Sequence, residues 1–268
     1  MNKQIALALM TLFLAATALN APAAVVTLTT ADGDGADSMV SQFEDNPNAD
    51  QDVNYGAAGR LWARTVSAKG RFQAIFVRFD ISGYVSGSFT GTPTLGLTKY
   101  RDEDTGTDLI VYGLNEGVDT WIEGDGGTDD SPAGELTYDN APGIAQDATY
   151  GDNDVDLGEV TELVSDAEGF QLTGDKGEEI TVSDSDFLTF LNADTDGLVT
   201  FIIARTDDNN GIDDIATKET TSLDSGTSIP LGSGAPSLNF DGQPIPEPGT
   251  LALLGLGGLA GAIRRRRR

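Results

Sequence analysis

The chain has 268 residues, no cysteine, no histidine and a formal net charge of −27 at pH 7. This composition excludes disulfide bonds, a Ser-His-Asp catalytic triad and the histidine sites that commonly hold zinc. Nucleic acid is excluded as a partner, because a chain this acidic repels phosphates.

The N-terminal segment, residues 1–23, has the pattern of a cleaved secretion signal. Lys3 is its only charged residue, and the apolar run 5–19 has the length of a signal peptide. Ala21 and Ala23 supply the small residues that a signal peptidase reads. The alternative, a buried first helix, requires a polar face that this run lacks.

The body, residues 24–243, is predicted to be one all-β domain, an antiparallel β-sandwich of the jelly-roll type. Short runs rich in Val, Ile, Phe, Thr and Tyr are separated by Gly, Asp, Asn and Pro, a pattern typical of such sandwiches. The expected strands are 25–30, 60–66, 72–81, 94–100, 108–114, 153–160, 197–206 and 236–240. Segment 161–193 is expected to be a loop or hairpin insertion with a short helix at 185–191. Helices are otherwise expected at the two ends, as the signal helix and a short hydrophobic C-terminal helix.

Two acidic loops are candidate calcium sites, because calcium prefers carboxylate and carbonyl oxygens. The candidate ligands are Asp32, Asp34 and Asp37 in the first loop and Asp207, Asp208 and Asp213 in the second. We therefore expect structural Ca²⁺ as a candidate cofactor and no other. The alternative is that these residues form Asx-rich turns without an ion.

A third acidic stretch, NADTDG at 192–197, opens like an EF-hand loop. The twelfth position of such a loop requires Glu, and here it is Ile203 within an apolar run. An EF-hand is therefore rejected, and a turn leading into a strand is expected.

Basic residues concentrate between positions 60 and 78. Arg60, Trp62 and Arg64 alternate along a predicted strand and should share one face, and Lys69 and Arg71 follow. An aromatic ring between guanidinium groups suits a sugar acid, since the ring stacks on the sugar and arginine pairs with carboxylates. The alternative is that these arginines pair with nearby Asp and Glu while Trp62 covers the core.

Four pieces of the body resemble a known domain family. They are NYG with RLWAR (54–64), AIFVRFDISG (74–83), IVYGLNEGVDTWIE with LTYDNAPG (110–143), and GLVTFIIART (197–206). Their order resembles the DNRLRE-type β-sandwich domain, which is similar to carbohydrate-binding module family 96. The resemblance implies a jelly-roll module that binds polysaccharide, including uronates. Segment 215–219 lacks the aromatic residue that this family often has there.

The C-terminal segment, residues 244–268, has three parts in a fixed order: Pro-Glu-Pro, an apolar run and terminal arginines. The signal residues are Pro246, Glu247, Pro248, Arg264, Arg265 and Arg266. The apolar run, 251–263, is shorter than the roughly 20 residues that a bilayer requires. The segment resembles the PEP-CTERM sorting signal, which implies processing by an exosortase-type protease in a Gram-negative bacterium. A plain tail anchor is the alternative.

These features predict an exported surface or matrix protein that is tethered transiently to the inner membrane and then released. Its expected function is non-catalytic binding of acidic exopolysaccharide. The alternatives are a structural biofilm protein with a calcium-dependent acidic surface, and a polysaccharide lyase. Catalysis is not expected, because carboxylates are so frequent here that a pair of them carries no information.

Overall fold

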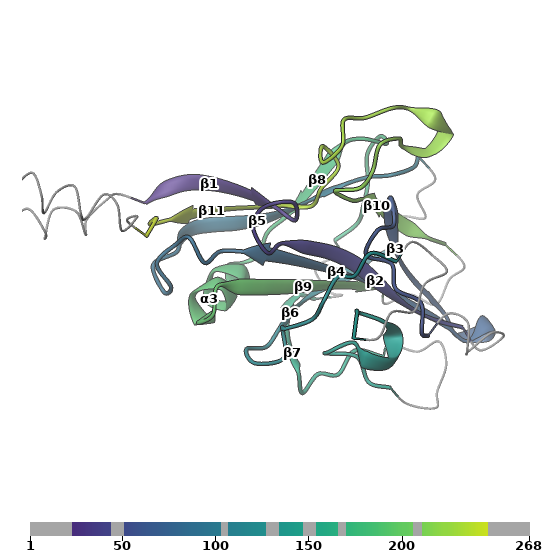
Figure 1. Ribbon diagram of the computed structural model, residues 1–268, viewed down its shortest axis with the longest axis horizontal. Coiled ribbons are helices and arrows are strands. Elements are labelled where there is room, and N and C mark those ends of the chain that lie inside the picture. Colours follow the sequence, from purple (N-terminus) through teal and green to yellow (C-terminus); the bar gives the residue numbers. More distant parts are fainter. Residues whose placement is uncertain are drawn as a thin grey trace, which may run out of the picture.

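Two antiparallel sheets form the body, as Figure 1 shows, and this confirms the predicted all-β sandwich. The computed structural model describes residues 23–43, 51–102, 107–126, 134–146, 154–165, 170–205 and 211–245. The predicted signal helix and C-terminal hydrophobic helix lie outside the described residues.

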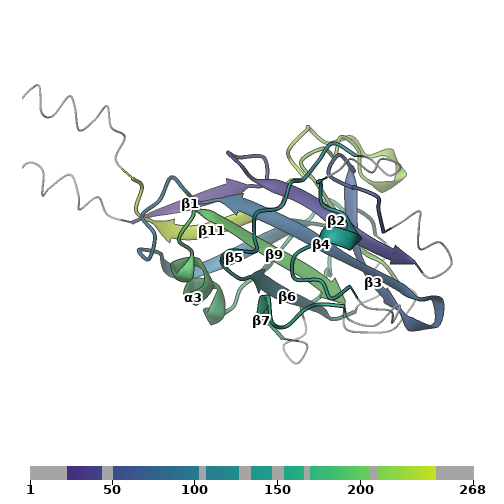
Figure 2. The same ribbon diagram turned by 60° about the horizontal axis from the view of Figure 1, so that its bottom comes forward.

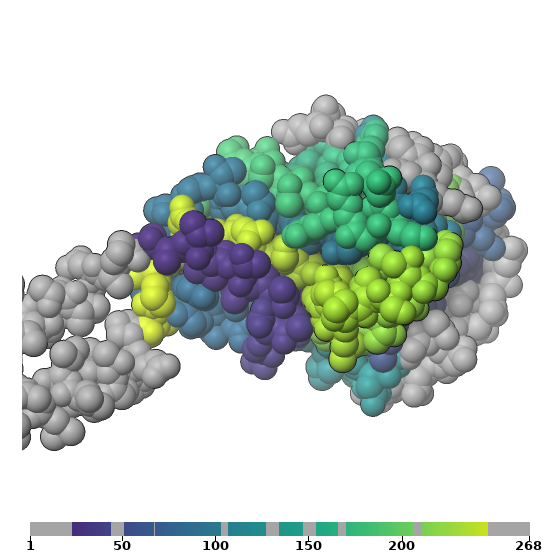
Figure 3. Space-filling view, turned by 90° about the horizontal axis from the view of Figure 1, so that it is seen from above, coloured from purple at the N-terminus to yellow at the C-terminus, as the bar shows by residue number. Residues whose placement is uncertain are grey.

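The smaller sheet has the strand order β1-β11-β5-β8. Its strands are β1 (Ala24–Thr29), β5 (Thr90–Thr98), β8 (Glu179–Val182) and β11 (Ser237–Gly242). Ala24 lies opposite Gly242, so the start of β1 and the end of β11 meet at one end of the sandwich (Figures 1 and 2). Figure 3 shows β1, in purple, running along the outer surface of the molecule.

The larger sheet has the order β10-β3-β4-β9-β6-β7, and β2 also pairs with β4. Its strands are β2 (Ala36–Phe43), β3 (Arg60–Val66), β4 (Arg71–Asp80), β6 (Leu109–Leu114), β7 (Val160–Val164), β9 (Leu198–Arg205) and β10 (Asp213–Ala216). Pairing of β3 with β4 covers only three residues of each strand. Beyond them β3 pairs with β10, which approaches the smaller sheet through the Lys99–Ile215 bridge. The β3–β10 pair therefore joins the two sheets at one side.

The main core lies between the sheets. Leu95, Leu238 and Phe240 from the smaller sheet pack in one cluster with Val77 and Phe201 from the larger sheet. All five are at most 3% exposed, and their removal from water drives the two sheets together.

A second core covers the other face of the larger sheet. Phe76 and Tyr112 of this sheet pack with Trp121, Leu136 and Tyr138, which belong to the long connection between β6 and β7. Strands covered on both faces bury consecutive side chains, and this explains the continuous apolar runs in β4 and β9. Trp121 is held by a hydrogen bond from Nε1 to Thr200 Oγ1 at 3.0 Å.

The helix α3 (Ser185–Ala193) confirms the helix that was expected from 185 to 191. It begins after Asp184, whose carboxylate accepts a hydrogen bond from the backbone N–H of Asp186 at 2.8 Å. Phe187 and Leu191 are one helical turn apart, and both are buried against the main core. Within the described residues, no helix has the length and apolar character that crossing a membrane requires.

Two strand predictions were wrong in detail. The expected strand at 153–160 is a turn-rich connection with one bridge, Ile144–Val155, and β7 begins only at Val160. The expected insertion at 161–193 contributes β7 and β8 to the two sheets in addition to α3. In the first case apolar residues suggested a strand where the chain turns and Leu157 is exposed, and in the second the polar residues of the short strand β8 concealed its pattern.

Candidate functional site

The alternation predicted for β3 is confirmed. Arg60, Trp62 and Arg64 are half-buried, whereas Leu61 and Ala63 between them are completely buried. The strand therefore gives Leu61 and Ala63 to the main core and the other set to a partly open surface, from which Trp62 still packs against the core.

The guanidinium of Arg60 lies between two aromatic rings. Its central carbon is 5.1 Å from the ring centre of Trp62 and 5.5 Å from that of Tyr100, and its side chain is 41% exposed. The rings of Trp62 and Tyr55 also pack edge to face, with their centres 6.0 Å apart. Cation–π contacts of this kind fix the orientation of an arginine. We call Arg60, Trp62 and Tyr100 the Arg60 surface.

Asp214 of β10 forms ion pairs with Arg60 and with the neighbouring Arg101. Arg101 donates to Asp214 Oδ2 through Nε at 2.6 Å, and Arg60 Nη1 lies 3.6 Å from the same oxygen. Burial raises the pKa of Asp214, although both arginines act in the opposite direction. Arg60 therefore pairs with a carboxylate, as one interpretation of the sequence expected, and its guanidinium still remains accessible, as glycan binding would require. Neither Tyr100 nor Arg101 was among the predicted site residues, because they come from the segment that follows β5.

The remaining predicted glycan-binding residues lie farther along the same hairpin. Burial, together with the charges of Arg71, Arg205 and Arg101, lowers the pKa of Arg64. Arg71 lies over the ring of Phe43 at 4.6 Å, and Lys69 is exposed in the short 3₁₀ turn η1 (Ser67–Lys69). Of the predicted basic residues, Arg64 and Arg71 therefore interact electrostatically, and Arg60 differs from them because two aromatic rings lie beside its guanidinium.

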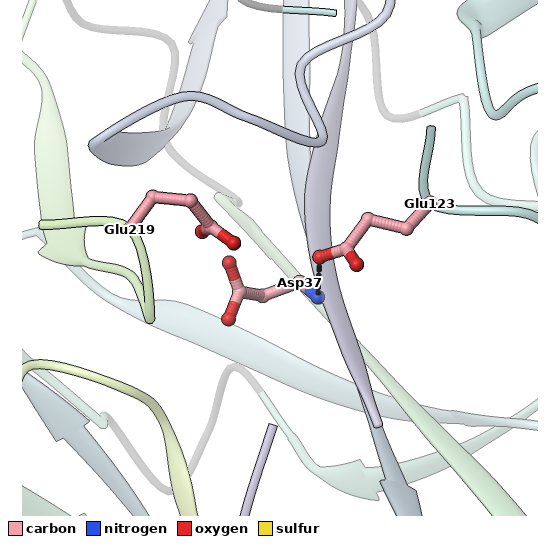
Figure 4. A group of neighbouring side chains, drawn as sticks. All are labelled: Asp37, Glu123 and Glu219. Carbon is pink, nitrogen blue, oxygen red and sulfur yellow. Dashed lines mark hydrogen bonds between the residues drawn. The ribbon is translucent and has the colours of Figure 1, made fainter. Parts of the chain in front are cut away.

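A separate group of carboxylates surrounds Asp37 of β2, and Figure 4 shows Glu123 and Glu219 pointing toward it. The group has oxygen atoms within 4.8 Å of one another. Glu123 Oε1 accepts a hydrogen bond from the Asp37 backbone N–H at 2.7 Å. Asp37 is fully buried, and Thr30 Oγ1 donates to its carboxylate.

An internal ammonium group balances this carboxylate group. Lys218 Nζ donates to Glu123 Oε1 and lies 3.9 Å from Glu219 Oε1. Burial raises the pKa of Glu219 to about 8, and the charge of Asp37 is the second cause. The pKa of Asp37 is also raised, mainly by burial. A lysine and a retained proton therefore compensate these three carboxylates.

The first predicted calcium loop, 32–37, is a turn only to residue 35, because Ala36 and Asp37 already belong to β2. Asp32 caps the turn by accepting from the Thr29 backbone N–H at 2.7 Å. The Asp34 backbone N–H donates to Asp80 at 3.0 Å. The structure therefore does not bring Asp32, Asp34 and Asp37 together around one point.

The second predicted calcium loop is described only in part. Asp213 lies in β10 and is buried, with its Oδ2 3.4 Å from Arg205 Nε. Thr107 Oγ1 also donates to it. Asp207 and Asp208 lie outside the described residues, as do the signal residues Pro246 to Arg266.

Comparison with known proteins gives one family match. Residues 244–268 match the model of the PEP-CTERM protein-sorting motif, and this confirms the interpretation of the tail. No curated protein matches the chain. The resemblance of the body to DNRLRE-type and family 96 carbohydrate-binding domains stays a prediction. The chain is therefore that of an exported protein, directed to the cell surface of a Gram-negative bacterium by an exosortase sorting system that recognises its C-terminal PEP-CTERM motif.

Proposed function

We propose that the body is a non-catalytic module that binds acidic exopolysaccharide at the Arg60 surface. The observation that carries this proposal is the accessible guanidinium of Arg60, held between the rings of Trp62 and Tyr100. A guanidinium fixed in this way donates hydrogen bonds to a carboxylate with little further loss of side-chain entropy.

Trp62 has a different role in this proposal from the one expected from the sequence. Because Arg60 already lies over its ring, Trp62 orients the guanidinium instead of stacking on a sugar. Tyr100 performs the same role from the other side. The sugar acid is therefore recognised through its carboxylate.

The charge of the whole chain restricts where an acidic polymer can approach. Because the chain has a net charge of −27, most of its surface repels polyuronates. The arginines clustered between positions 60 and 78 form a region where such a polymer could bind. The β3–β10 side lies away from the paired ends of β1 and β11 (Figures 1 and 2). A body held at the membrane through its C-terminal tail would therefore present the Arg60 surface outward.

The test uses protein purified after export and its retention on immobilised polyuronate, with a neutral glucan as the control polymer. Arg60→Gln is expected to weaken binding to polyuronate about tenfold. Arg60→Lys keeps the charge but loses the planar fork, so an intermediate loss is expected. Binding of Arg60→Gln that equals the wild type would show that another surface binds the polymer.

Two alternatives make different predictions in the same assay. A matrix protein with a calcium-dependent acidic surface would lose retention when EDTA is added, whatever residue occupies position 60. A polysaccharide lyase would release unsaturated uronate, which absorbs in the ultraviolet, and our proposal expects no such product.

A further inference from the structure

We propose that Glu116, Asp194 and Asp196 form a binding site for a divalent cation of the calcium type. These three carboxylates have ligand oxygens within 4.8 Å of one another. The site is independent of the Arg60 surface and of polysaccharide binding.

The fold brings these residues together from two distant segments. Strands β6 and β9 are antiparallel neighbours, so the chain leaving β6 and the turn entering β9 lie at the same end of the sheet. Glu116 follows β6, and Asp194 and Asp196 lie in the turn between α3 and β9. Glu116 fastens the two segments by accepting from the Thr195 backbone N–H at 2.7 Å.

The turn holds its carboxylates in place through backbone hydrogen bonds. Asp194 Oδ2 accepts from the Gly197 N–H at 3.0 Å, and Asp196 Oδ1 accepts from the Leu198 N–H at 2.9 Å. Gly197 has a φ of 90°, a conformation that side chains with a Cβ rarely adopt. These contacts use one oxygen of each aspartate, and the Asp194 carboxyl also lies within hydrogen-bond reach of the Glu116 carboxyl.

An unpartnered buried oxygen points to that ligand. Asp194 is only 4% exposed, and among the described residues its Oδ1 has no hydrogen-bond partner. Asp119, which lines the same cavity and is 2% exposed, also has an Oδ1 without a partner there. A buried polar atom without a partner is costly, and a bound cation would remove that cost.

Negative charges accumulate here, and the nearby Arg78 opposes the raised pKa of Asp119 without cancelling the effect of burial. Burial raises the pKa of Asp194 to about 7, and the charges of Glu116 and Asp196 add to this effect. Within the part of the chain that the structure describes, none of these carboxylates forms an ion pair. The group around Asp37 differs, because Lys218 lies within it.

A cavity of about 320 Å³ gives access to the site. Glu116, Asp119 and Asp194 line it, together with Asn115, Asp186 and Phe190. Its volume leaves room for the water molecules that complete a coordination shell of six to eight oxygens around calcium. The ligands are all oxygens and the chain has no histidine or cysteine, so zinc and copper fit poorly.

The test measures calcium binding and melting temperature with protein purified from outside the cells, at pH 7, in EDTA and in calcium chloride. We expect a dissociation constant on the order of 0.1–1 mM, the range of extracellular modules. At 10 mM calcium the melting temperature should rise by about 5 °C. An unchanged melting temperature and no measurable binding would overturn the proposal.

Three variants separate this site from the rest of the acidic surface. Asp194→Asn should abolish the calcium response and raise the melting temperature in EDTA, which would also demonstrate that the variant folds. Asp186→Asn removes the same charge from the same cavity outside the carboxylate group, so its calcium response should remain. Glu219→Gln tests the group around Asp37 and should also keep the response. A calcium response lost in Glu219→Gln, or kept in Asp194→Asn, would contradict the assignment.

Discussion

Glu219 illustrates how the neighbours of a single residue set its charge. Burial and the negative charge of Asp37 both oppose ionisation, and together they raise its pKa to about 8. The unfolded chain ionises this carboxyl near 4.5. Folding therefore favours the protonated form between these two values, and the associated stability is lost as the pH rises through that interval.

At the residue scale, Glu219→Gln should remove this pH dependence, because the amide is neutral at every pH and can still donate to Asp37. We expect its free energy of unfolding to exceed that of the wild type by about 1 kcal/mol at pH 9 and to match it near pH 5. Urea unfolding followed by fluorescence measures the difference. Glu162→Gln, on the exposed part of β7, removes the same charge, and its difference from the wild type should be the same at pH 5 and at pH 9. A constant offset between Glu219→Gln and wild type would contradict the assignment.

At the scale of elements, the helix α3 could be predicted from the sequence, whereas the strand β2 could not. The helix was predictable because Phe187 and Leu191 repeat at helical spacing behind a capping aspartate. Strand β2 was missed, since its sequence ADSMVSQF alternates no apolar residues and polar groups such as Asp37 and Gln42 are fully buried in it. Only the surrounding layers determine that these polar groups are inside.

Phe187 should contribute most of the attachment of α3 to the sandwich. It is completely buried and packs on Phe201 with ring centres 5.4 Å apart. Phe187→Ala should lower the free energy of unfolding by about 3–5 kcal/mol. Phe190→Ala is the matched control, since Phe190 also contacts Phe201, at 5.5 Å, but is only half-buried. Equal losses in the two variants, measured by denaturant unfolding, would show that burial of Phe187 is not the dominant contact.

At the scale of the whole molecule, the sorting motif at 244–268 directly follows the β-sandwich in the chain. The body ends where β11 pairs with β1, so a tail that follows Gly242 leaves from the end at which the body begins. Cleavage near Pro-Glu-Pro would therefore release the sandwich without disturbing a strand.

Mass spectrometry of the exported protein should find no peptide that contains Arg264 to Arg268. Replacing Pro246 and Pro248 by Ala is expected to block processing and to leave the uncleaved protein in the membrane fraction. Replacing Pro230 and Pro236 by Ala is the control, because both lie in the sandwich outside the motif. Mature protein that retains its arginines would show that the tail acts as an anchor.

The sequence by itself determined the sorting motif and the all-β class, because these depend on local composition, order and periodicity, whereas the secretion signal at residues 1–23 stays a prediction. It also placed Arg60, Trp62 and Arg64 on one face, since alternation is a property of a single strand. The tertiary structure alone decided which side chains from distant segments meet. Tyr100 reaches Arg60, and Glu116 reaches Asp194, from segments far apart in the chain. Contacts of this kind depend on sheet order and register, which local sequence does not encode.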